Sequence, residues 1–240
     1  MKLSNLKKDM DSIIQSKSTD IAVKYSTELY DHYTSSFTAD YDDILIKRVE
    51  HVYKSNSCRP QLLVDVGTGT AQLLIKLGTQ GQCDQLKMIG TDLFDEMVVA
   101  ANNNVEKFGL TDQIRIVRED VHAMSFSNSV CDLVTSRATI HHWRDPVQAL
   151  REIYRLLKPN GIAIIHDIRR DAKQAMKDVF QANRVAAGIP RCNFSEKFTP
   201  EEVKTMVIRA NTSASFIITA PNKGPAALGF ELFLRKHASN

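Results

Sequence analysis

Hydrophobic and polar positions follow two different rhythms along the chain, and the rhythm changes near Pro60. Before this residue, scattered apolar residues recur at helical spacing, as Ile21 and Tyr25 do. After it, short apolar runs alternate with longer amphipathic stretches, which is the pattern of strands that alternate with helices. The sequence therefore predicts a helical N-terminal cap over 1–58 and a single compact domain over 59–240.

The predicted strands are short and apolar, which is typical of a parallel sheet covered by helices on both faces. Five of them are expected over 61–66, 86–91, 113–118, 130–136 and 162–168. Helices are expected between them over 70–80, 94–108 and 146–157, and a turn over 158–161. Gly109 is suited to end the second of these helices. Asp145 and Pro146 are suited to open the third, as N-cap and first helical residue.

The C-terminal part begins with a predicted helix over 171–187, a loop over 188–198 and a second helix that Thr199 caps. Two strands follow, over 214–219 and 230–235. Their connection is too short for a crossover helix, so the pair is predicted to be antiparallel. The predicted fold class is therefore α/β: a Rossmann-like three-layer sandwich with a seven-stranded, mostly parallel sheet and one antiparallel strand near the C-terminus.

Composition narrows the class of protein. Charged residues make up 25% of the chain and the net charge is +3, with Lys and Arg spread along the sequence, which argues against a nucleic-acid-binding face. No apolar run approaches the ~20 residues that span a bilayer, and no secretory signal opens the chain. We expect a cytoplasmic protein with no membrane partner, and the oligomeric state stays open. The cysteines lack metal-ligand spacing, so no metal is expected; they are Cys58, Cys83, Cys131 and Cys192.

A glycine-containing loop over 64–71 joins the first predicted strand to the first helix. Gly67 and Gly69 permit a tight turn and a close approach of a ligand to the backbone, although an ordinary turn would use them too. A dinucleotide fingerprint needs glycine at position 72, where Gln72 stands. Asp65 precedes the glycines and suits a ligand with an ammonium group better than a pyrophosphate. S-adenosylmethionine carries an α-ammonium, an α-carboxylate and a sulfonium, and no phosphate.

Two further carboxylates follow predicted strands. Asp92 ends the second strand and can accept hydrogen bonds from both ribose hydroxyls or cap the next helix. Asp120 follows the third strand and can accept from an adenine amino group, while the Val121 N–H reaches a ring nitrogen. A solvated loop carboxylate is the alternative for Asp120, and Glu119 is its rival. Leu93 is placed to pack on the adenine face.

These segments resemble the motifs of the class I S-adenosylmethionine-dependent methyltransferases, in the branch that includes the ubiquinone/menaquinone-biosynthesis and many small-molecule enzymes. The resemblance covers roughly residues 61–170 and is carried by VDVGTGTAQL (64–73), TDLFDEMVVAANNN (91–104), REDVHAMSFSNSVCDLVTSRATIHHWRDP (118–146) and ALREIYRLLKPNGIAIIHD (149–167). It implies S-adenosylmethionine as methyl donor and S-adenosylhomocysteine as product. One departure is visible, because the family often has a third glycine where Ala71 stands.

The resemblance also implies roles for single residues. It assigns the methionine moiety to Asp65, Gly67, Thr68 and Gly69. It assigns the ribose to Asp92 and the adenine to Asp120 and Val121. Ser136 and Arg137 match the end of the fourth strand, beside the methyl group.

The methyl acceptor is expected over the carboxyl ends of the strands, near the segment 137–143. His141 and His142 are candidates for a general base if the acceptor is a hydroxyl, and a structural role for both is the alternative. Arg137 is a candidate for binding an acidic substrate group, or else a neighbouring carboxylate. His166 and Asp167 lie within reach of the same place.

Three other features complete the expected acceptor side. Trp143 is expected to pack in the core rather than stack on substrate. A lid is expected from the N-terminal helices, with Tyr25 and Tyr33, and from the loop 188–198. Cys192 in that loop is expected to be incidental.

The leading prediction is an enzyme that methylates an O, N or C atom of a small molecule. RNA or protein methylation is the runner-up. It is opposed by the lack of a basic cluster and of an Asn/Asp-Pro-Pro-aromatic motif after the fourth strand, where Ser136-Arg137-Ala138-Thr139 stands. An NAD-dependent oxidoreductase is opposed by Gln72 and Asp65. A non-catalytic S-adenosylmethionine-binding protein of the same fold is the remaining alternative.

Overall fold

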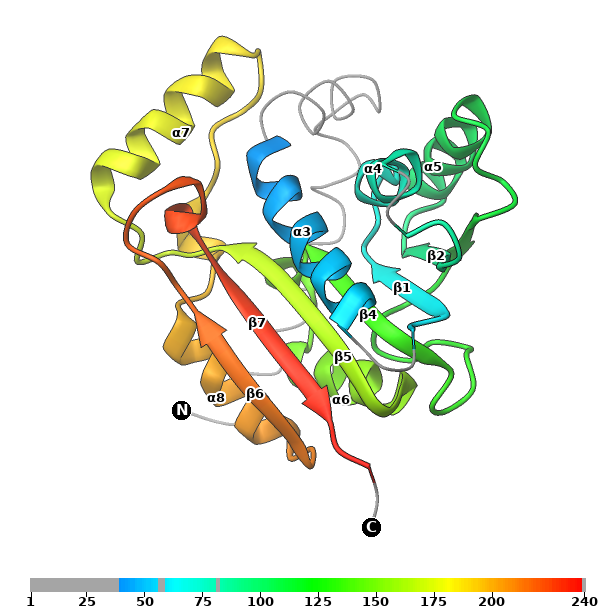
Figure 1. Cartoon of the computed structure of the whole chain (residues 1–240). Helices are drawn as coiled ribbons and strands as arrows, with labels where there is room; N and C mark the ends of the chain where they lie inside the picture. The colour runs from blue at the N-terminus through cyan, green and yellow to red at the C-terminus, as the bar shows by residue number, and fades with distance from the viewer. Residues whose placement is uncertain (1–38, 56–58, 81–82, 239–240) are drawn as a thin grey trace, which may run out of the picture.

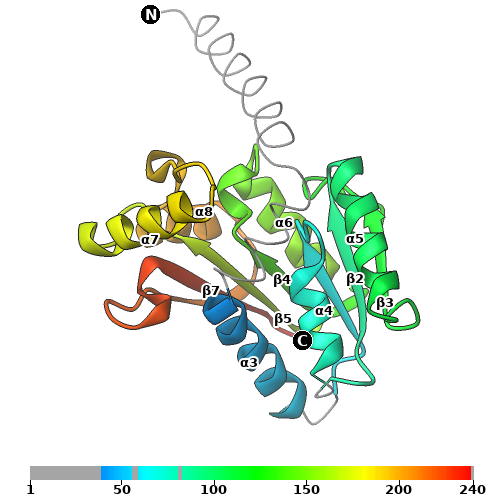
Figure 2. The ribbon, with the colours of Figure 1, turned by 90° about the horizontal axis from the view of Figure 1, so that it is seen from above.

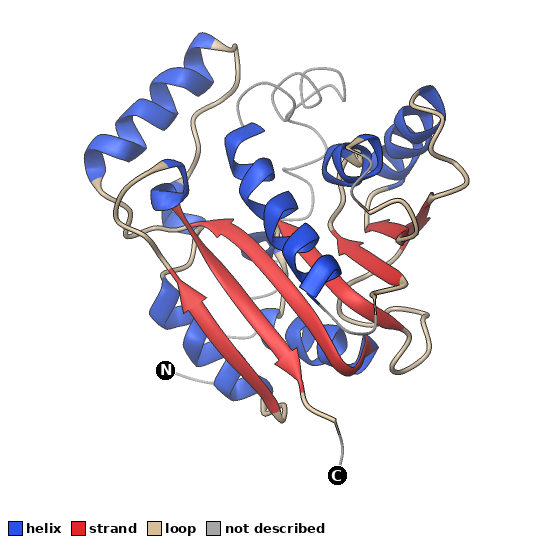
Figure 3. Ribbon diagram, in the orientation of Figure 1, coloured by secondary structure: helices blue, strands red, loops and turns tan. Residues whose placement is uncertain are grey.

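The computed structural model describes residues 39–55, 59–80 and 83–238. These residues form one twisted sheet with helices against both of its faces (Figures 1, 2 and 3). The predicted helices before residue 39, with Tyr25 and Tyr33, lie outside the described residues, and so does Cys58.

The sheet has seven strands in the order β3-β2-β1-β4-β5-β7-β6. The strands are β1 (Leu62–Val66), β2 (Lys87–Asp92), β3 (Ile114–Arg118), β4 (Cys131–Arg137), β5 (Leu157–Ile168), β6 (Ala214–Thr219) and β7 (Gly229–Lys236). The first five pair in parallel, while β7 runs antiparallel to both β5 and β6. The predicted α/β fold class and its antiparallel C-terminal strand are confirmed.

Neighbouring residues of each central strand point to opposite faces, and both faces are covered. Leu63 and Val64 of β1 are both fully buried, in two separate hydrophobic clusters. The cluster of Leu63 includes α3, α4 and α5, and the cluster of Val64 includes α6 and α8. The helices are α3 (Ala39–Ser55), α4 (Gln72–Thr79), α5 (Asp95–Lys107), α6 (Pro146–Leu156), α7 (Gln174–Ala186) and α8 (Pro200–Ala210).

Local signals placed several element ends correctly. Gly109 follows α5 with a φ of +67°, as a helix stop requires. The Asp145 side chain accepts a hydrogen bond from the Gln148 N–H at 3.0 Å and caps α6. Thr199 and Glu202 bond each other's backbone in a capping box at the start of α8.

Two predicted boundaries are wrong. The segment 158–161, predicted as a turn, is part of β5. The strand continues through Asn160, whose φ is +66°, because its pairing with β4 shifts register at this point. Helix α7 begins at Gln174 rather than at 171. It has no buried residue and lies away from the sheet (Figure 1), so no apolar face fixes where it starts.

Helix α3 packs directly on the sheet domain. Its buried residues Leu45 and Val49 share a hydrophobic cluster with Leu74 of α4 and Leu63 of β1. The division into a cap over 1–58 and a domain over 59–240 stays a prediction. In the described part of the chain, no helix is long and apolar enough to cross a membrane.

Candidate active site

The carboxyl ends of the five parallel strands bring the predicted site residues to one edge of the sheet. Pairing aligns Val66 of β1 with Thr91 of β2, and Arg137 of β4 with His166 of β5. The loop after β1 therefore lies between Asp92 on one side and the segment after β4 on the other. Ligands of open α/β sheets bind at this edge, where the strand order reverses beside β1.

The loop after β1 has the backbone of a ligand cradle. Gly67 and Gly69 have φ values of +69° and +55°. Ala71, where the family often has glycine, also has a left-handed φ of +66° and is fully buried. The Thr68 N–H donates to the carbonyl of Thr91 at 2.8 Å and so fixes the loop against β2.

Replacing Gly67 with alanine is expected to destabilise the fold more than the same change at Gly109. Both positions have nearly the same φ, so both variants carry about 1–2 kcal/mol of left-handed strain. A Cβ at position 67 would also lie 2.5 Å from Cγ2 of Thr139, whereas at position 109 nothing lies within 4 Å. Urea unfolding of the two variants measures the difference, and equal losses of stability would contradict the tight contact between the loop and Thr139.

Asp65 lies under this loop as a buried carboxylate. Its Oδ1 accepts a hydrogen bond from the Thr135 hydroxyl at 2.7 Å. Burial raises the pKa of Asp65 to about 6, although the hydrogen bond from Thr135, the nearby Thr68 hydroxyl and the charge of Arg137 act against the rise. Among the described residues, no lysine or arginine forms an ion pair with it. A cationic group of a ligand is what would stabilise the ionised form.

Asp92 joins the glycine loop to the start of α5. Its Oδ2 accepts from the Gly69 N–H at 2.9 Å, and its Oδ1 accepts from the Phe94 N–H at 3.1 Å. Burial raises the pKa of this carboxyl, and the backbone hydrogen bonds oppose the rise. Each carboxylate oxygen can accept a second bond, so these contacts leave room for two ribose hydroxyls. Leu93 beside it is 45% exposed, as a residue that covers a ligand ring could be.

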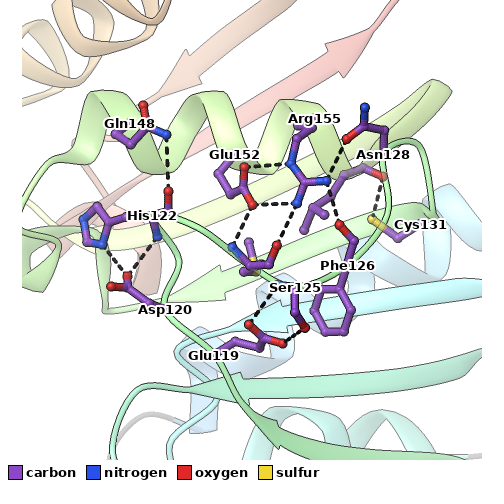
Figure 4. Close-up of polar contacts among 12 residues, drawn as sticks. Glu119, Asp120, His122, Ser125, Phe126, Asn128, Cys131, Gln148, Glu152 and Arg155 are labelled. Carbon is purple, nitrogen blue, oxygen red and sulfur yellow. Dashed lines mark hydrogen bonds and ion pairs between the residues drawn. The ribbon is translucent and has the colours of Figure 1, made fainter.

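The loop after β3 holds Asp120 by local contacts (Figure 4). Its Oδ1 accepts from the backbone N–H of His122 at 2.9 Å and lies 2.5 Å from Nδ1 of the same residue. His122 Nε2 in turn accepts from the Asp145 N–H at 3.1 Å. Burial raises the pKa of Asp120, but the bonds from His122 outweigh it and keep the carboxyl below its usual range. Glu119, the rival candidate, binds Ser125 within its own loop.

Side chains of helix α6 also hold the loop after β3 by hydrogen bonds (Figure 4). The sequence did not predict these contacts. The buried Glu152 accepts from the Met124 N–H at 2.7 Å. Arg155 donates to the carbonyls of Phe126 and Met124 at 2.7 and 3.0 Å. The available signal was Glu152 itself, a carboxylate among the buried apolar positions of an amphipathic helix.

The acceptor side contains a buried histidine–carboxylate pair. His141 Nδ1 lies 2.6 Å from Oδ2 of Asp167, which also faces the His141 N–H at 3.3 Å. Burial alone would raise the pKa of Asp167, but His141 and Lys197 hold it below its ordinary value. In the described part of the chain, Nε2 of His141 makes no hydrogen bond. His142 is exposed and lies against His141, with 3.7 Å between ring centroids.

Arg137 and Ser136, two other predicted site residues, both contact other side chains of the protein. Arg137 Nε lies 2.7 Å from Oδ1 of Asp42, a fully buried residue of α3. A neighbouring carboxylate, one of the two alternatives for Arg137, is therefore present. Ser136 is fully buried and shares a hydrogen bond with Thr139. Asp42 escaped prediction, although it stands at helical spacing from buried Leu45 on α3, an unusual place for a carboxylate.

Two further predictions concern side chains nearby. His166 Nε2 lies 2.8 Å from Oε2 of Glu231 on β7, and this carboxylate also binds Arg48 of α3. That pair points the His166 ring toward β7 rather than toward His141. Trp143 is 9% exposed and packs in the hydrophobic cluster of α6, as predicted.

Comparison with known proteins shows which sequences and folds the chain resembles. Residues 64–165 match the protein family described as "Methyltransferase domain". The demethylmenaquinone methyltransferase of Bacteroides fragilis is 34% identical over 122 residues, which are 51% of this chain and 49% of that protein. The chain thus matches about half the length of this curated relative.

Two solved structures share the fold. The plantazolicin methyltransferase BamL, in complex with a triazolic desmethylPZN analog and S-adenosylhomocysteine, has a TM-score of 0.73 at 12% identity, over 99% of this chain and 100% of that one. A putative S-adenosylmethionine-dependent methyltransferase from Methanococcus maripaludis has a TM-score of 0.70 at 22% identity, over 89% and 93%. Over residues 64–165 the chain therefore matches a methyltransferase domain, and its fold is shared with S-adenosylmethionine-dependent methyltransferases of known structure.

Proposed function

We propose that the chain is an enzyme that transfers the methyl group of S-adenosylmethionine to a small-molecule acceptor. The observation that carries the proposal is the buried Asp65 carboxylate, without an ion-pair partner among the described residues, under a glycine loop in which Gly67 lies too close to Thr139 to accept a Cβ. When bound, S-adenosylmethionine supplies a methyl group on a positively charged sulfur.

The residues at the strand ends fit the parts of this donor. Asp65 would bind the α-ammonium, and the backbone at Gly67, Thr68 and Gly69 would lie along the methionine moiety. Asp92 would accept from the ribose hydroxyls. Asp120, Val121 and Leu93 would surround the adenine. Ser136 would support this site indirectly: it shares a hydrogen bond with Thr139, and the Thr139 side chain packs against Gly67 of the glycine loop.

His141 is the general base of the proposed reaction when the acceptor is a hydroxyl. Asp167 accepts the Nδ1 proton of His141, and this fixes the tautomer whose Nε2 is free to accept. The acceptor hydroxyl would pass its proton to Nε2 while its oxygen forms the bond to the methyl carbon; the bond from that carbon to sulfur would break, with its electron pair left on sulfur, and S-adenosylhomocysteine would be the leaving group. Burial of the pair excludes water, so the chain mainly orients the acceptor and holds one proton. His142 and Arg137 would complete the wall of this pocket.

A small acceptor and a cytoplasmic location are part of the proposal. The even spread of Lys and Arg supports an acceptor other than a nucleic acid. The names of the similar proteins, a demethylmenaquinone and a plantazolicin methyltransferase, also point to compounds rather than to RNA.

Replacing Asp92 with alanine is expected to weaken S-adenosylmethionine binding by about 10- to 100-fold. The change removes a charged acceptor for the ribose and also releases the Gly69 N–H from its partner. Asp95→Ala is the matched control, because the Asp95 side chain is 71% exposed on α5. Calorimetric titration of both variants is the measurement, and unchanged affinity in Asp92→Ala would remove Asp92 from the donor site.

Catalysis itself is tested by turnover against a panel of small phenols, amines and carbon acids, with formation of S-adenosylhomocysteine as the signal. Product formation with at least one class supports an enzyme. A protein that binds the donor but forms no product with any class would instead be the non-catalytic binding protein. Methylation of RNA or protein added to the same assay would favour the runner-up.

A further inference from the structure

Lys197 is a buried lysine beside the proposed base. Only 6% of its surface is exposed. It belongs to the loop between α7 and α8, which the segment after β5 holds in place. Arg170 donates from its backbone N–H to the carbonyl of Phe198 at 3.2 Å, and from its guanidinium to the carbonyl of Lys197 at 3.0 Å. The position of Lys197 is thus fixed by backbone contacts that do not depend on its own ammonium group.

The ammonium group of Lys197 has no acceptor for its hydrogen bonds among the described residues. Among the residues that the structure describes, its Nζ makes neither a hydrogen bond nor an ion pair. The nearby Asp167 is occupied, since Oδ2 faces His141 and Oδ1 accepts from the Ile168 N–H at 2.7 Å. The Cys192 thiol offers no anion, because burial raises its pKa.

A buried ammonium group without a partner is costly, and such groups in native proteins normally have hydrogen-bond acceptors. Among the described residues, Nζ is not one of the unpaired polar atoms that are completely shielded from solvent, so it keeps some contact with water. Burial lowers the pKa of Lys197, while the charge of Asp167 acts to raise it. An anionic oxygen would supply both the missing acceptor and the missing charge.

We infer that Lys197 binds a carboxylate of the methyl acceptor, so that the substrate class is small hydroxylated acids. The inference rests on the proposed function. Asp167 lies 2.6 Å from Nδ1 of His141, and its charge also acts on Lys197, so the proposed anion-binding group and the proposed base have one carboxylate as a common neighbour. In the proposed arrangement, an acid held by Lys197 would present its neighbouring hydroxyl to Nε2 of His141. Lys197 is a specificity-determining residue in this arrangement.

Matched pairs of an aromatic acid and its amide test the inference on the full chain saturated with S-adenosylhomocysteine. The probes are benzoate against benzamide, salicylate against salicylamide, and 1-hydroxy-2-naphthoate against its amide. Calorimetry is expected to show at least one acid binding about tenfold or more tightly than its amide. Lys197→Met should abolish this preference and Lys197→Arg should keep part of it. Lys204→Met should keep all of it, because that lysine is 53% exposed on α8.

Each other outcome overturns a defined statement. If S-adenosylhomocysteine fails to bind the unmodified chain, the proposed function fails and the inference fails with it. If it binds but no acid is preferred over its amide, only the inference fails. A tenfold loss of S-adenosylhomocysteine affinity in Lys197→Met would assign the anion to the donor's own carboxylate and would also overturn the inference. If Lys197→Met does not fold, the inference is tested by comparing the preference for acid over amide in the unmodified chain with that in Lys197→Arg. A preference that is unchanged in Lys197→Arg would then overturn the inference.

Discussion

Replacing His141 with alanine is expected to lower turnover by a factor of about 10²–10⁴ while donor affinity stays nearly unchanged. The reason is that Nε2 is the proposed proton acceptor, whereas the donor residues lie on β1, β2 and the loop after β3. The variant also leaves the buried Asp167 without its imidazole partner, which costs about 1–3 kcal/mol of stability. Turnover, donor affinity and melting temperature must therefore be measured on the same preparation.

Two variants separate a chemical role of His141 from a structural one. His141→Asn retains an amide donor for Asp167 and should recover stability without recovering turnover. His51→Ala removes an exposed histidine of α3 and should change neither. A stable His141 variant with normal turnover would exclude His141 as the base and leave His142 as the next candidate, because the His166 ring points toward Glu231 on β7. A loss of stability alone would make His141 structural.

Donor affinity is expected to fall about tenfold between pH 7 and pH 5. The pKa of Asp65 in the folded chain is about 6, above its ordinary value of 3.8, because burial disfavours the ionised form. Binding of an ammonium group requires the ionised carboxylate, so protonation competes with the ligand as pH falls through about 6. Calorimetry with S-adenosylhomocysteine across this range measures the slope. Asp65→Asn should bind weakly, with little dependence on pH.

The stability of the ligand-free chain should depend on pH in the opposite sense. Since the folded pKa of Asp65 is raised, its contribution to stability is complete below about pH 4 and is lost as pH rises through about 6. A shift from 3.8 to about 6 corresponds to about 3 kcal/mol. The difference in unfolding free energy between the unmodified chain and Asp65→Asn, measured from pH 4 to pH 7, isolates this term. A difference independent of pH would contradict a buried Asp65 that has no ion-pair partner among the described residues.

The fold was predictable because burial dominates the sequence pattern. The predicted strand over 61–66 and the observed β1 (Leu62–Val66) differ by one residue, since both faces of this strand are covered and its residues are apolar. The antiparallel β7 followed from the short connection that precedes it. Helix α7 was placed less well, because a helix without buried residues leaves no periodic signal at its ends.

The grouping of the proposed donor residues at one edge of the sheet was predictable for a related reason, and the contacts on the proposed acceptor side were not. Gly67, Asp65 and Asp92 stand at fixed places relative to strand ends, so sequence order alone brings them together. The Arg137–Asp42 ion pair and the His141–Asp167 pair join residues 95 and 26 positions apart, which no local pattern specifies. Lys197 stands in an irregular loop, and nothing in the sequence indicates that it is buried.

Calorimetric titration of the unmodified chain with S-adenosylhomocysteine, and in parallel with NAD, tests the central claim most directly. The account predicts saturable 1:1 binding of S-adenosylhomocysteine and no binding of NAD, because Asp65 would face the ammonium group of the ligand and Gln72 replaces the third glycine of the dinucleotide loop. Binding of NAD, or the absence of any S-adenosylhomocysteine binding, would contradict it.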